Sequence, residues 1–340
     1  MVSDGGAQPA RCSTFAGARR AHHRGMSSSS SGSSFSSSPP LGIALVSLAA
    51  VLWGTSGTAQ KLGAGGLSPF WVGAAQLAVA SAFLLVLLLA SLRGGHRLAL
   101  HPRRAGLGWS GFAWASLGIG GYSVFFYEGV RLAGVGLGTA VAIGSSPIWA
   151  GLLQAAVLRA PLSPLWWLGT LVSVAGGAAM VWGPGAGGSA PWAGLAMCLL
   201  AGLSYGGYAL VNKRLVERMP PRVVNFYVFT GAALVAAPVA WLHTGAPHWT
   251  LPAVLVVVYL GAVVSGIAHM LFSVGLRHIS GPTGVALSLI EPAAAFVLAV
   301  WVVGERQPLA AWLGLAAVLA GLLVVVGAEM RGAGRQNATK

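Results

Sequence analysis

The sequence has little charge and very little acid. Charged residues make up 8 % of the 340 positions, and only six of them are Asp or Glu. A soluble globular domain carries about a quarter charged residues. The composition therefore does not fit a soluble domain or a soluble enzyme, although the length alone would allow two domains.

Cysteine is scarce as well. Cys12 lies in a polar segment and Cys198 in an apolar run, which excludes a disulfide framework and a metal-ligand cluster. The glycine-rich stretch "GPGAGG" has no lysine and no strand before it, so it predicts a loop rather than a phosphate-binding motif. We expect no metal and no cofactor, and an ATP-driven pump would need a separate subunit.

Long apolar runs dominate what is present. The chain is 56 % hydrophobic with a mean hydropathy of +0.76, and it contains runs of about 20 apolar residues, the length that crosses a bilayer. These runs predict an all-α integral membrane protein with about ten transmembrane helices in the lipid bilayer. They cover residues 41–61, 70–92, 105–128, 135–158, 164–183, 190–212, 221–243, 250–275, 281–303 and 308–328.

Basic residues predict the orientation, because basic loops resist translocation. With ten spans, 17 of the 20 lysines and arginines fall on the side of the N-terminus, and only Lys61, Arg131 and Arg306 fall on the other. We expect a multi-pass protein of the plasma (inner) membrane with both termini cytoplasmic. The basic residues form no stripe with interleaved aromatics, so the net charge of +14 does not indicate nucleic-acid binding.

The two ends of the chain differ in composition from the spans. Residues 1–40 are rich in Ser, Gly and Arg, a composition that predicts a disordered tail. The same composition also fits an organelle transit peptide, and a translation start at Met26 is left open. Residues 329–340 are predicted to form a cytoplasmic tail.

The chain contains an internal repeat. "LWGTSGTAQKL" (52–62) matches "SYGGYALVNKRL" (204–215). The predicted units cover residues 41–183 and 190–328 with five spans each, so the second unit enters the membrane from the opposite side, as an inverted repeat. The landmark pairs are Trp53 with Tyr205, Gly54 with Gly206, Lys61 with Lys213, Pro69 with Pro221, Arg131 with Arg277, Pro147 with Pro292, Trp167 with Trp312, Gly169 with Gly314 and Gly176 with Gly321.

Together these landmarks resemble the EamA-type branch of the drug/metabolite transporter superfamily over residues 41–328. The resemblance implies ten helices, a central substrate cavity between the halves, and export or exchange of small metabolites rather than catalysis. Two features depart from the family pattern. Arg159 and Ala160 stand where the second half has Gly304 and Glu305, and Gln76 stands where members often carry Arg.

Glu291 and Pro292 interrupt an apolar run near its middle. An ionised carboxylate at that depth costs several kcal/mol unless it is hydrated or paired. Pro292 lacks the N–H that would bond the Ser288 carbonyl, so we expect a broken helix that faces a cavity. Two interpretations are open: substrate or proton binding, and a structural hydrogen bond to a neighbouring helix.

The equivalent stretch of the first half has Ser145 and Ser146 before Pro147. Ser146 therefore stands where Glu291 stands, and the halves are expected to share the kink but differ in charge. Either these serines face the substrate, or they bond back to their own helix.

Further candidates lie in the other spans. Trp53 with Ser56, and Tyr205 with Tyr208, are three residues apart and share a helical face, where they would line the cavity or serve as packing anchors. The Gln76 side chain would hydrogen-bond either the substrate or a neighbouring helix. His269 and Ser265 share a helical face, which suggests an intramembrane hydrolase as an alternative. Nothing else in the sequence supplies the remaining groups that such an enzyme needs, namely an oxyanion hole and partners from other helices.

The sequence thus predicts a secondary transporter, an exporter or exchanger of small organic metabolites that works by alternating access and is proton-coupled through Glu291. The alternative is an intramembrane enzyme or a non-transporting scaffold. One carboxylate among aromatics favours a cationic or zwitterionic amine or amino acid as substrate. A homodimer is left open.

Overall fold

The computed structural model describes residues 38–63, 66–94, 101–102, 108–181, 192–302, 304 and 306–338. Within these residues every regular element is a helix. The predicted disordered tail, as far as residue 37, and Glu305 lie outside them. The elements are α1 (Pro39–Gly54), α2 (Ser56–Gly63), α3 (Pro69–Arg93), α4 (Trp109–Ala133), α5 (Val135–Val157), α6 (Pro164–Val181), α7 (Trp192–Arg218), α8 (Pro221–Thr244), α9 (Leu251–Tyr259), the π-helical segment η2 (Leu260–Ile267), α10 (Ala268–Gly275), α11 (Gly281–Leu287), α12 (Ile290–Trp301) and α13 (Leu309–Ala338).

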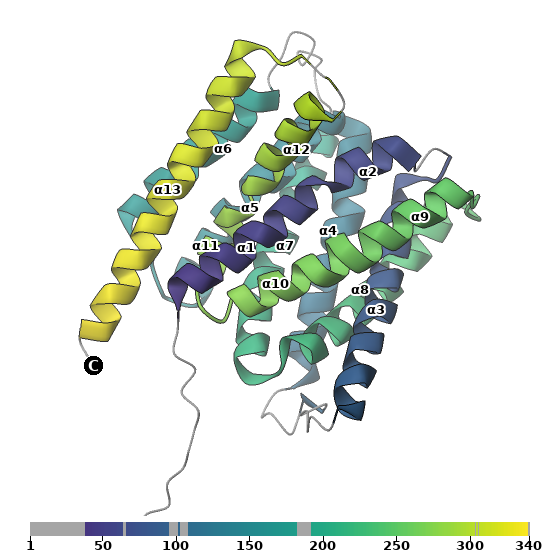
Figure 1. Ribbon diagram of the computed structural model, residues 1–340, viewed down its shortest axis with the longest axis horizontal. Helices are drawn as coiled ribbons and strands as arrows, with labels where there is room; N and C mark the ends of the chain where they lie inside the picture. Colours follow the sequence, from purple (N-terminus) through teal and green to yellow (C-terminus); the bar gives the residue numbers. More distant parts are fainter. Residues whose placement is uncertain are drawn as a thin grey trace, which may run out of the picture. The chain divides into compact units, whose positions relative to one another are not determined.

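These elements join into ten helical rods, as predicted, since α1 continues into α2, α9 through η2 into α10, and α11 into α12 (Figure 1). Eight rods are long and apolar enough to cross a membrane. Of the other two, α6 is apolar but shorter, and α4 is long but rich in glycine, serine and tyrosine. The predicted fold class, an all-α membrane protein of about ten spans, is confirmed.

Local signals explain where the rods begin and end. The Ser68 hydroxyl accepts a hydrogen bond from the Trp71 N–H ahead of Pro69, and Thr250 does the same for Ala253 at the start of α9, as N-cap residues do. At the end of α8, Gly245 adopts a φ of 66°, a conformation that other residues rarely reach. Short links containing Pro, Gly and Ser therefore separate the rods.

Some rods run further than the apolar pattern predicts, and α7 and α13 do so most clearly. The sixth predicted span ends at residue 212, yet α7 continues to Arg218, and α13 continues ten residues beyond its predicted end at 328, into the segment predicted as a tail. Hydrophobicity ends where the hydrocarbon layer ends, whereas a helix continues as long as polar residues such as Lys, Arg and Glu sustain it.

Irregular backbone is concentrated in three neighbouring rods. The break at Thr55, the π-helical segment η2 and the break at Ser288 and Leu289 lie in rods that pack against one another. The equivalent rods of the other repeat, α7, α4 and α5, are each a single helix. Pro147 lies inside the continuous helix α5, so the break next to Pro292 has no counterpart in the first half, and the kink expected at Pro147 stays a prediction.

The helices α6 and α13 show the two-fold relation between the repeats. The paired positions are Gly169 with Gly314 and Gly176 with Gly321, and the contacts cross. Gly169 lies against the backbone of Gly321, while Gly176 lies against the backbone of Gly314. Such reciprocal contacts are the mark of a two-fold interface, and here they place α6 and α13 side by side and antiparallel (Figure 1).

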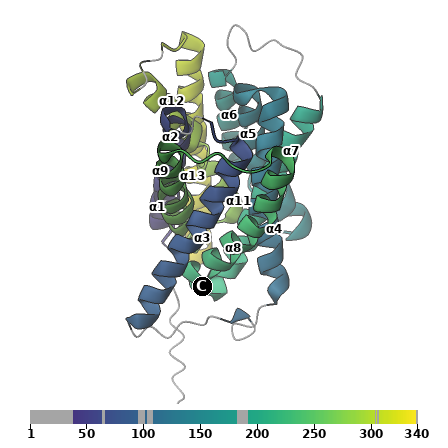
Figure 2. The same cartoon turned by 90° about the vertical axis from the view of Figure 1, so that its right-hand side faces the viewer.

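The same reciprocity holds in the interior. A Cβ atom on Gly54 would lie 2.7 Å from the Glu291 carbonyl oxygen, and one on Gly206 would lie 3.0 Å from the Ser146 carbonyl oxygen. This contact supports the sequence register in which Ser146 stands where Glu291 stands. The rods then form two equivalent groups, one of α1, α9, α10 and α12 and one of α4, α5 and α7, which lie on opposite sides in Figure 2.

Candidate substrate site

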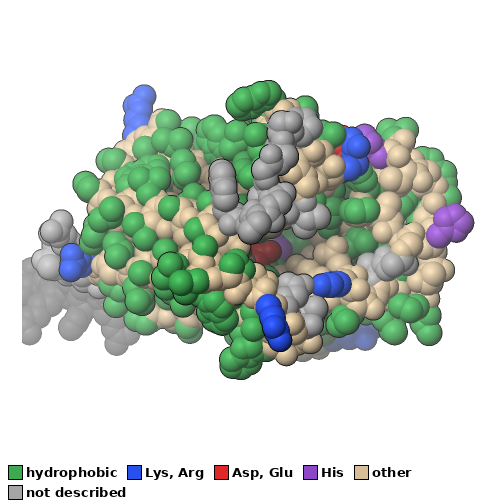
Figure 3. Space-filling view, turned by 90° about the horizontal axis from the view of Figure 1, so that it is seen from above, with side chains coloured by type: hydrophobic (Ala, Val, Ile, Leu, Met, Phe, Trp, Pro, Cys, Tyr) green, Lys and Arg blue, Asp and Glu red, His purple; other side chains and the backbone are tan. Residues whose placement is uncertain are grey.

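A cavity of about 670 Å³ lies between these two groups of helices. It opens toward the end of the bundle that holds Pro69 and Gln307, which we call the open end, and none of its lining residues comes from the opposite, closed end, where α7 meets α8. Figure 3 looks into the hollow from the open end and shows an acidic side chain at its bottom. Glu291 is the one acidic residue among the described residues that line the cavity.

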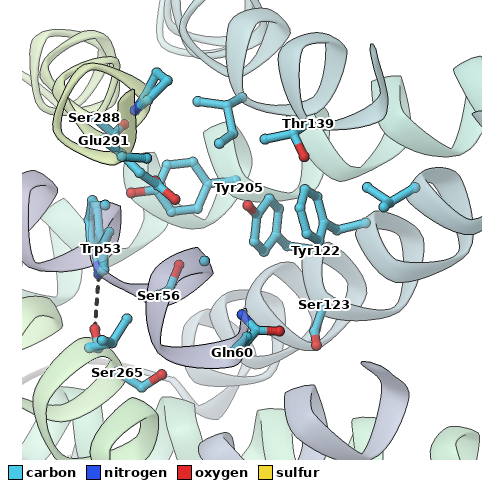
Figure 4. A pocket seen from close by; sticks show the side chains of 18 of the residues that line it. Trp53, Ser56, Gln60, Tyr122, Ser123, Thr139, Tyr205, Ser265, Ser288 and Glu291 are labelled. Atoms are coloured by element: carbon cyan, nitrogen blue, oxygen red, sulfur yellow. Dashed lines mark hydrogen bonds between the residues drawn. The ribbon is translucent and has the colours of Figure 1, made fainter. Parts of the chain in front are cut away.

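Glu291 lies at the break between α11 and α12. Because Pro292 has no N–H, the Ser288 carbonyl cannot form the usual bond to residue 292. It accepts the Glu291 N–H instead, at 2.9 Å, and the Ser288 hydroxyl bonds back to the Val285 carbonyl. The predicted interruption is therefore present, and it directs the Glu291 side chain into the cavity toward Tyr205 (Figure 4).

No lysine or arginine is among the described residues that line the cavity. The Glu291 carboxylate forms no ion pair within the described part of the chain. Its labelled polar neighbours in Figure 4 carry hydroxyl groups, since Ser288 and Tyr205 lie beside it and Tyr122 lies beyond Tyr205. In an apolar layer, such a carboxylate needs water, a proton or a cation.

Aromatic rings form one wall of the cavity. The Trp53 ring lies 4.9 Å from the His269 ring and 6.2 Å from the Tyr205 ring, and Tyr205 lies 5.5 Å from Tyr122. Trp53 is held in place because its Nε1–H donates to the Val264 carbonyl of η2 at 3.0 Å (Figure 4). The π-helical bonding of η2 leaves the Val264 carbonyl available to Trp53, because the Ala268 N–H bonds to the Val263 carbonyl five residues earlier rather than to that of Val264.

Eight of the eleven predicted site residues line this cavity. They come from six different rods of the bundle, so residues far apart in sequence meet in one place. The eight are Trp53, Ser56, Gln76, Ser146, Tyr205, His269, Glu291 and Pro292.

The other three predicted residues lie elsewhere. Ser145 and Ser146 both donate to the Ala142 carbonyl of their own helix, at 3.3 and 2.8 Å, the alternative that the sequence left open, and only Ser146 reaches the cavity. Pro147 lies within α5 and outside the lining. Tyr208 is 1 % exposed and lies one turn beyond Tyr205, past the bottom of the cavity.

Sequence reasoning missed many lining residues, and the largest group of them lies on α4. Tyr122, Ser123, Phe126 and Tyr127 face the cavity from this helix, and Gln60 faces it from α2. The repeat register contained a signal for one of them, Ser123. Arg131 pairs with Arg277, so Ser123 corresponds to His269, which was a candidate, and Tyr127 corresponds to Ser273.

Metal binding would need a cluster of ligands, and hydrolysis would need a serine joined to a base. The described residues contain no group of three His, Cys, Asp or Glu side chains that could hold a metal ion. Ser265 and His269 both line the cavity, but no hydrogen bond joins the Ser265 hydroxyl to the His269 ring. Glu128 and Arg131, three residues apart near the open end of α4, form an ion pair.

The closed end of the bundle is held by hydrogen bonds from basic side chains to backbone carbonyls. Lys213 donates to the Leu276 carbonyl at 2.8 Å, and Arg277 donates to the carbonyls of Val216 and Met219 at 2.6 and 3.0 Å. His278 follows in the link after α10. Partial burial, Arg277 and Lys213 lower the pKa of its imidazole, which keeps Nδ1 free to accept the Ser38 N–H at 3.2 Å.

Comparison with known proteins gives a consistent result. The model of the EamA-like transporter family matches residues 40–182 and 192–327. An uncharacterized transporter of Bacillus subtilis, YwfM, is 32 % identical over 84 % of this chain and 94 % of its own length. A biotin transporter of Salmonella typhimurium is 34 % identical over 34 % of this chain and 40 % of its own length.

Solved structures agree on the fold. One crystal structure superposes with a TM-score of 0.71, covering 85 % of this chain and 98 % of that chain at 23 % sequence identity. At that identity the likeness concerns the arrangement of the helices.

Proposed function

This chain belongs to the EamA-like transporter family and is a multi-pass membrane transporter of small molecules, and from that premise we propose its direction and mechanism. It exports or exchanges small organic metabolites across the plasma membrane by alternating access, and this transport is coupled to protons through Glu291. The observation that carries the proposal is the cavity between the two repeats. It is open at one end, and its single carboxylate lies at a broken helix without a cationic partner among the described residues.

The position of Glu291 supports a coupling role. Transporters built from inverted repeats bind substrate and coupling ions at interrupted helices near the middle of the membrane, where the repeats meet. Glu291 lies at such an interruption and beside the Gly54 contact that both halves share. When the cavity faces one side, the carboxylate takes up a proton from that side, and when it faces the other it releases the proton.

The lining also suggests a substrate class. A carboxylate without a basic partner attracts a cation, and the faces of Trp53, Tyr122 and Tyr205 offer cation–π contacts. Hydroxyl and amide groups on Ser56, Gln60 and Gln76 add hydrogen bonds. We expect a cationic or zwitterionic amine or amino acid, and a thermal-shift screen of amino acids, amines and nucleosides on the purified protein tests this.

Coupling is tested by the Glu291→Gln variant. Glutamine keeps the size and hydrogen-bonding capacity of the side chain but fixes its charge at zero. In proteoliposomes, wild-type uptake of a radiolabelled amino acid and amine mixture should rise with an imposed pH step, whereas the variant should exchange substrate without responding to the step. Glu291→Asp should keep some coupling with a shifted pH optimum.

Glu128→Gln is the matched control. It removes a carboxylate from an ion pair at the open end of α4, outside the cavity lining, so its response to the pH step should match the wild type. A wild-type response in Glu291→Gln would leave Glu291 as a residue that bonds neighbouring helices and would end the coupling proposal. Absence of uptake by the wild type across the whole screen would count against transport of this substrate class.

A further inference from the structure

A polar network is buried in the interface between α7 and α10 at the closed end of the cavity. Asn212 Nδ2 donates to the Ser273 hydroxyl at 2.9 Å, and that hydroxyl donates to Asn225 Oδ1 at 2.8 Å. Asn225 Nδ2 in turn donates to the His269 carbonyl at 3.1 Å. The side chains of Asn212, Asn225 and Ser273 are completely buried.

The network is incomplete. Asn212 Oδ1 and the Nδ1 atom of His269 are buried and have no hydrogen-bond partner among the described residues, and the Tyr208 hydroxyl is buried beside them. A buried polar atom without a partner costs about 1 to 3 kcal/mol. This protein has apolar residues at most interior positions, so the cost calls for a reason.

The repeat register relates these residues to the open cavity. Lys61 pairs with Lys213, which makes Ser56 the equivalent of Tyr208 and Gln60 the equivalent of Asn212. Arg131 pairs with Arg277, which makes Tyr127 the equivalent of Ser273. The three first-half residues, Ser56, Gln60 and Tyr127, all line the cavity.

Contacts from a third helix support this register. Asn225 of α8 bonds to Ser273 and to the His269 backbone. Its equivalent in α3 is Gly73, which lies against Tyr127 and Ser123, the equivalents of the same two residues. The two interfaces are therefore related by the two-fold axis, although one is open and the other closed.

We propose that Tyr208, Asn212 and Ser273 line the pathway that opens from the bottom of the cavity toward the closed end, where they bind the polar groups of the substrate as it leaves or enters. This inference rests on the alternating access of the proposed function. In an inverted repeat, the second half takes the shape of the first when the transporter changes state. Asn212 and Ser273 then face water and substrate, as Gln60 and Tyr127 do in this structure.

The partners of the equivalent arginines at the two ends also differ between the closed and the open interface. At the closed end, Arg277 reaches across to the backbone of α7. Its equivalent Arg131 is paired with Glu128 on its own helix instead. The contact that closes one interface is thus replaced at the other, open interface by an ion pair within α4.

Contacts that are the same in both halves identify the parts that stay together. Gly129 lies against Cys198 and the Gly194 carbonyl, and Gly275 lies against Val46 and the Gly42 carbonyl, an equivalent set. Because both halves make the same contact at these glycines, we expect the α4–α7 contact at Cys198 to persist in both states. The native Cys198 is therefore a built-in control for labelling.

Thiol labelling from the two membrane faces tests the pathway. Ser273→Cys and Gln60→Cys are made separately in a Cys12→Ser background, and a hydrophilic maleimide is applied to right-side-out and inside-out vesicles. Gln60→Cys should react from one face and Ser273→Cys from the opposite face, while Cys198 stays unreactive. Ser273→Cys that reacts from neither face, or from the same face as Gln60→Cys, overturns the inference, as does labelling of Cys198 alongside it.

A second variant separates a pathway role from a structural role. Asn212→Leu removes the unpaired acceptor and leaves the Ser273 bond to Asn225 intact, so the Tm should be unchanged or higher. Uptake of the radiolabelled amino acid and amine mixture should fall about tenfold, because polar substrate groups lose a partner. A lower Tm with unchanged uptake would make Asn212 structural, whereas uptake that is absent in the wild type would count against the proposed function and not against the labelling result.

Discussion

At the scale of single residues, the cavity combines one carboxylate with hydroxyl groups and a ring nitrogen. Glu291 shares the lining with Tyr122, Tyr127 and Tyr205, and with His269, whose ring contacts Trp53. None of these groups carries the fixed positive charge that a buried carboxylate needs as a partner. A bound proton and a bound cation therefore compete for the same position, which is the condition for exchanging one against the other.

Trp53 offers a prediction at this scale. Its indole N–H holds the Val264 carbonyl of η2. Trp53→Phe keeps an aromatic ring but leaves that carbonyl without this donor, so we expect a loss of about 1 to 3 kcal/mol of stability. Thermal unfolding in detergent should show a clearly lower Tm for this variant.

Trp114→Phe serves as the comparison for Trp53→Phe. The Trp114 side chain is 66 % exposed on α4, so its replacement should leave the Tm within the error of the measurement. Equal effects of the two substitutions would show that the indole bond to η2 contributes nothing specific.

Some of these residues could be predicted from the sequence, and the reason lies in their chemistry. Glu291 stands out because acid is rare inside a membrane, and Pro292 because it breaks a helix. Tyr122 and Tyr127 do not stand out, since an aromatic residue in an apolar run serves equally well against lipid, helix or substrate. Tyr208 shares a face with Tyr205, but the sequence carries no information on how deep along that face the cavity ends.

At the scale of helices, the close contact of α6 and α13 depends on glycine. A Cβ atom on Gly176 would lie 2.6 Å from the Gly314 carbonyl oxygen, too close for any side chain, whereas one on the adjacent Gly177 would meet nothing within 4 Å. The two neighbouring glycines thus have opposite requirements. One allows the helices to approach, and the other faces open space.

Gly176→Ala should therefore destabilise the protein by about 1 to 3 kcal/mol, the usual cost of overpacking. Gly177→Ala should be neutral or stabilising by about 1 kcal/mol, because alanine favours helix over glycine. Thermal unfolding of the two variants checks the pair. A stabilised Gly176→Ala protein would contradict the two-fold contact between the repeats.

The existence of the helices could be predicted well, but their ends and interruptions could not. The length of an apolar run reports the thickness of the hydrocarbon layer, so it missed the polar continuation of α7 to Arg218. The π-helical segment η2 has no Pro or other local signal in "LGAVVSGI", and it depends on contacts with α1 and α3. Pro147 and Pro292 carry the same local signal, yet only the second coincides with a break.

At the scale of the whole molecule, ten rods that each cross the membrane would give an even number of crossings, so we expect both termini on one side. The excess of lysine and arginine in alternate links predicts that this side is the cytoplasm. We therefore expect the open end of the cavity to face outward and the end closed by Lys213 and Arg277 to face the cytoplasm.

Cysteine reporters test this orientation. His248, in the link between α8 and α9, and Arg218, at the end of α7, are both exposed and belong to opposite ends of the bundle. In a Cys12→Ser background, His248→Cys should react with an impermeant thiol reagent in intact cells, and Arg218→Cys should react only after the membrane is opened. The opposite pattern would reverse the orientation and with it the direction in which the cavity faces.

The hydrogen bonds that hold the closed end have a consequence for sequence evolution. The hydrogen bonds from Lys213 and Arg277 to Leu276, Val216 and Met219 end on carbonyl oxygens, while Lys213 also pairs with the Glu217 carboxylate of its own helix, and every amino acid supplies the same carbonyl. The acceptor positions can therefore change freely while the two cations cannot. Among homologous sequences, the residues at these three acceptor positions should therefore not covary with the two basic residues, so covariation would detect contacts between side chains of different helices but not these bonds that hold the closed end.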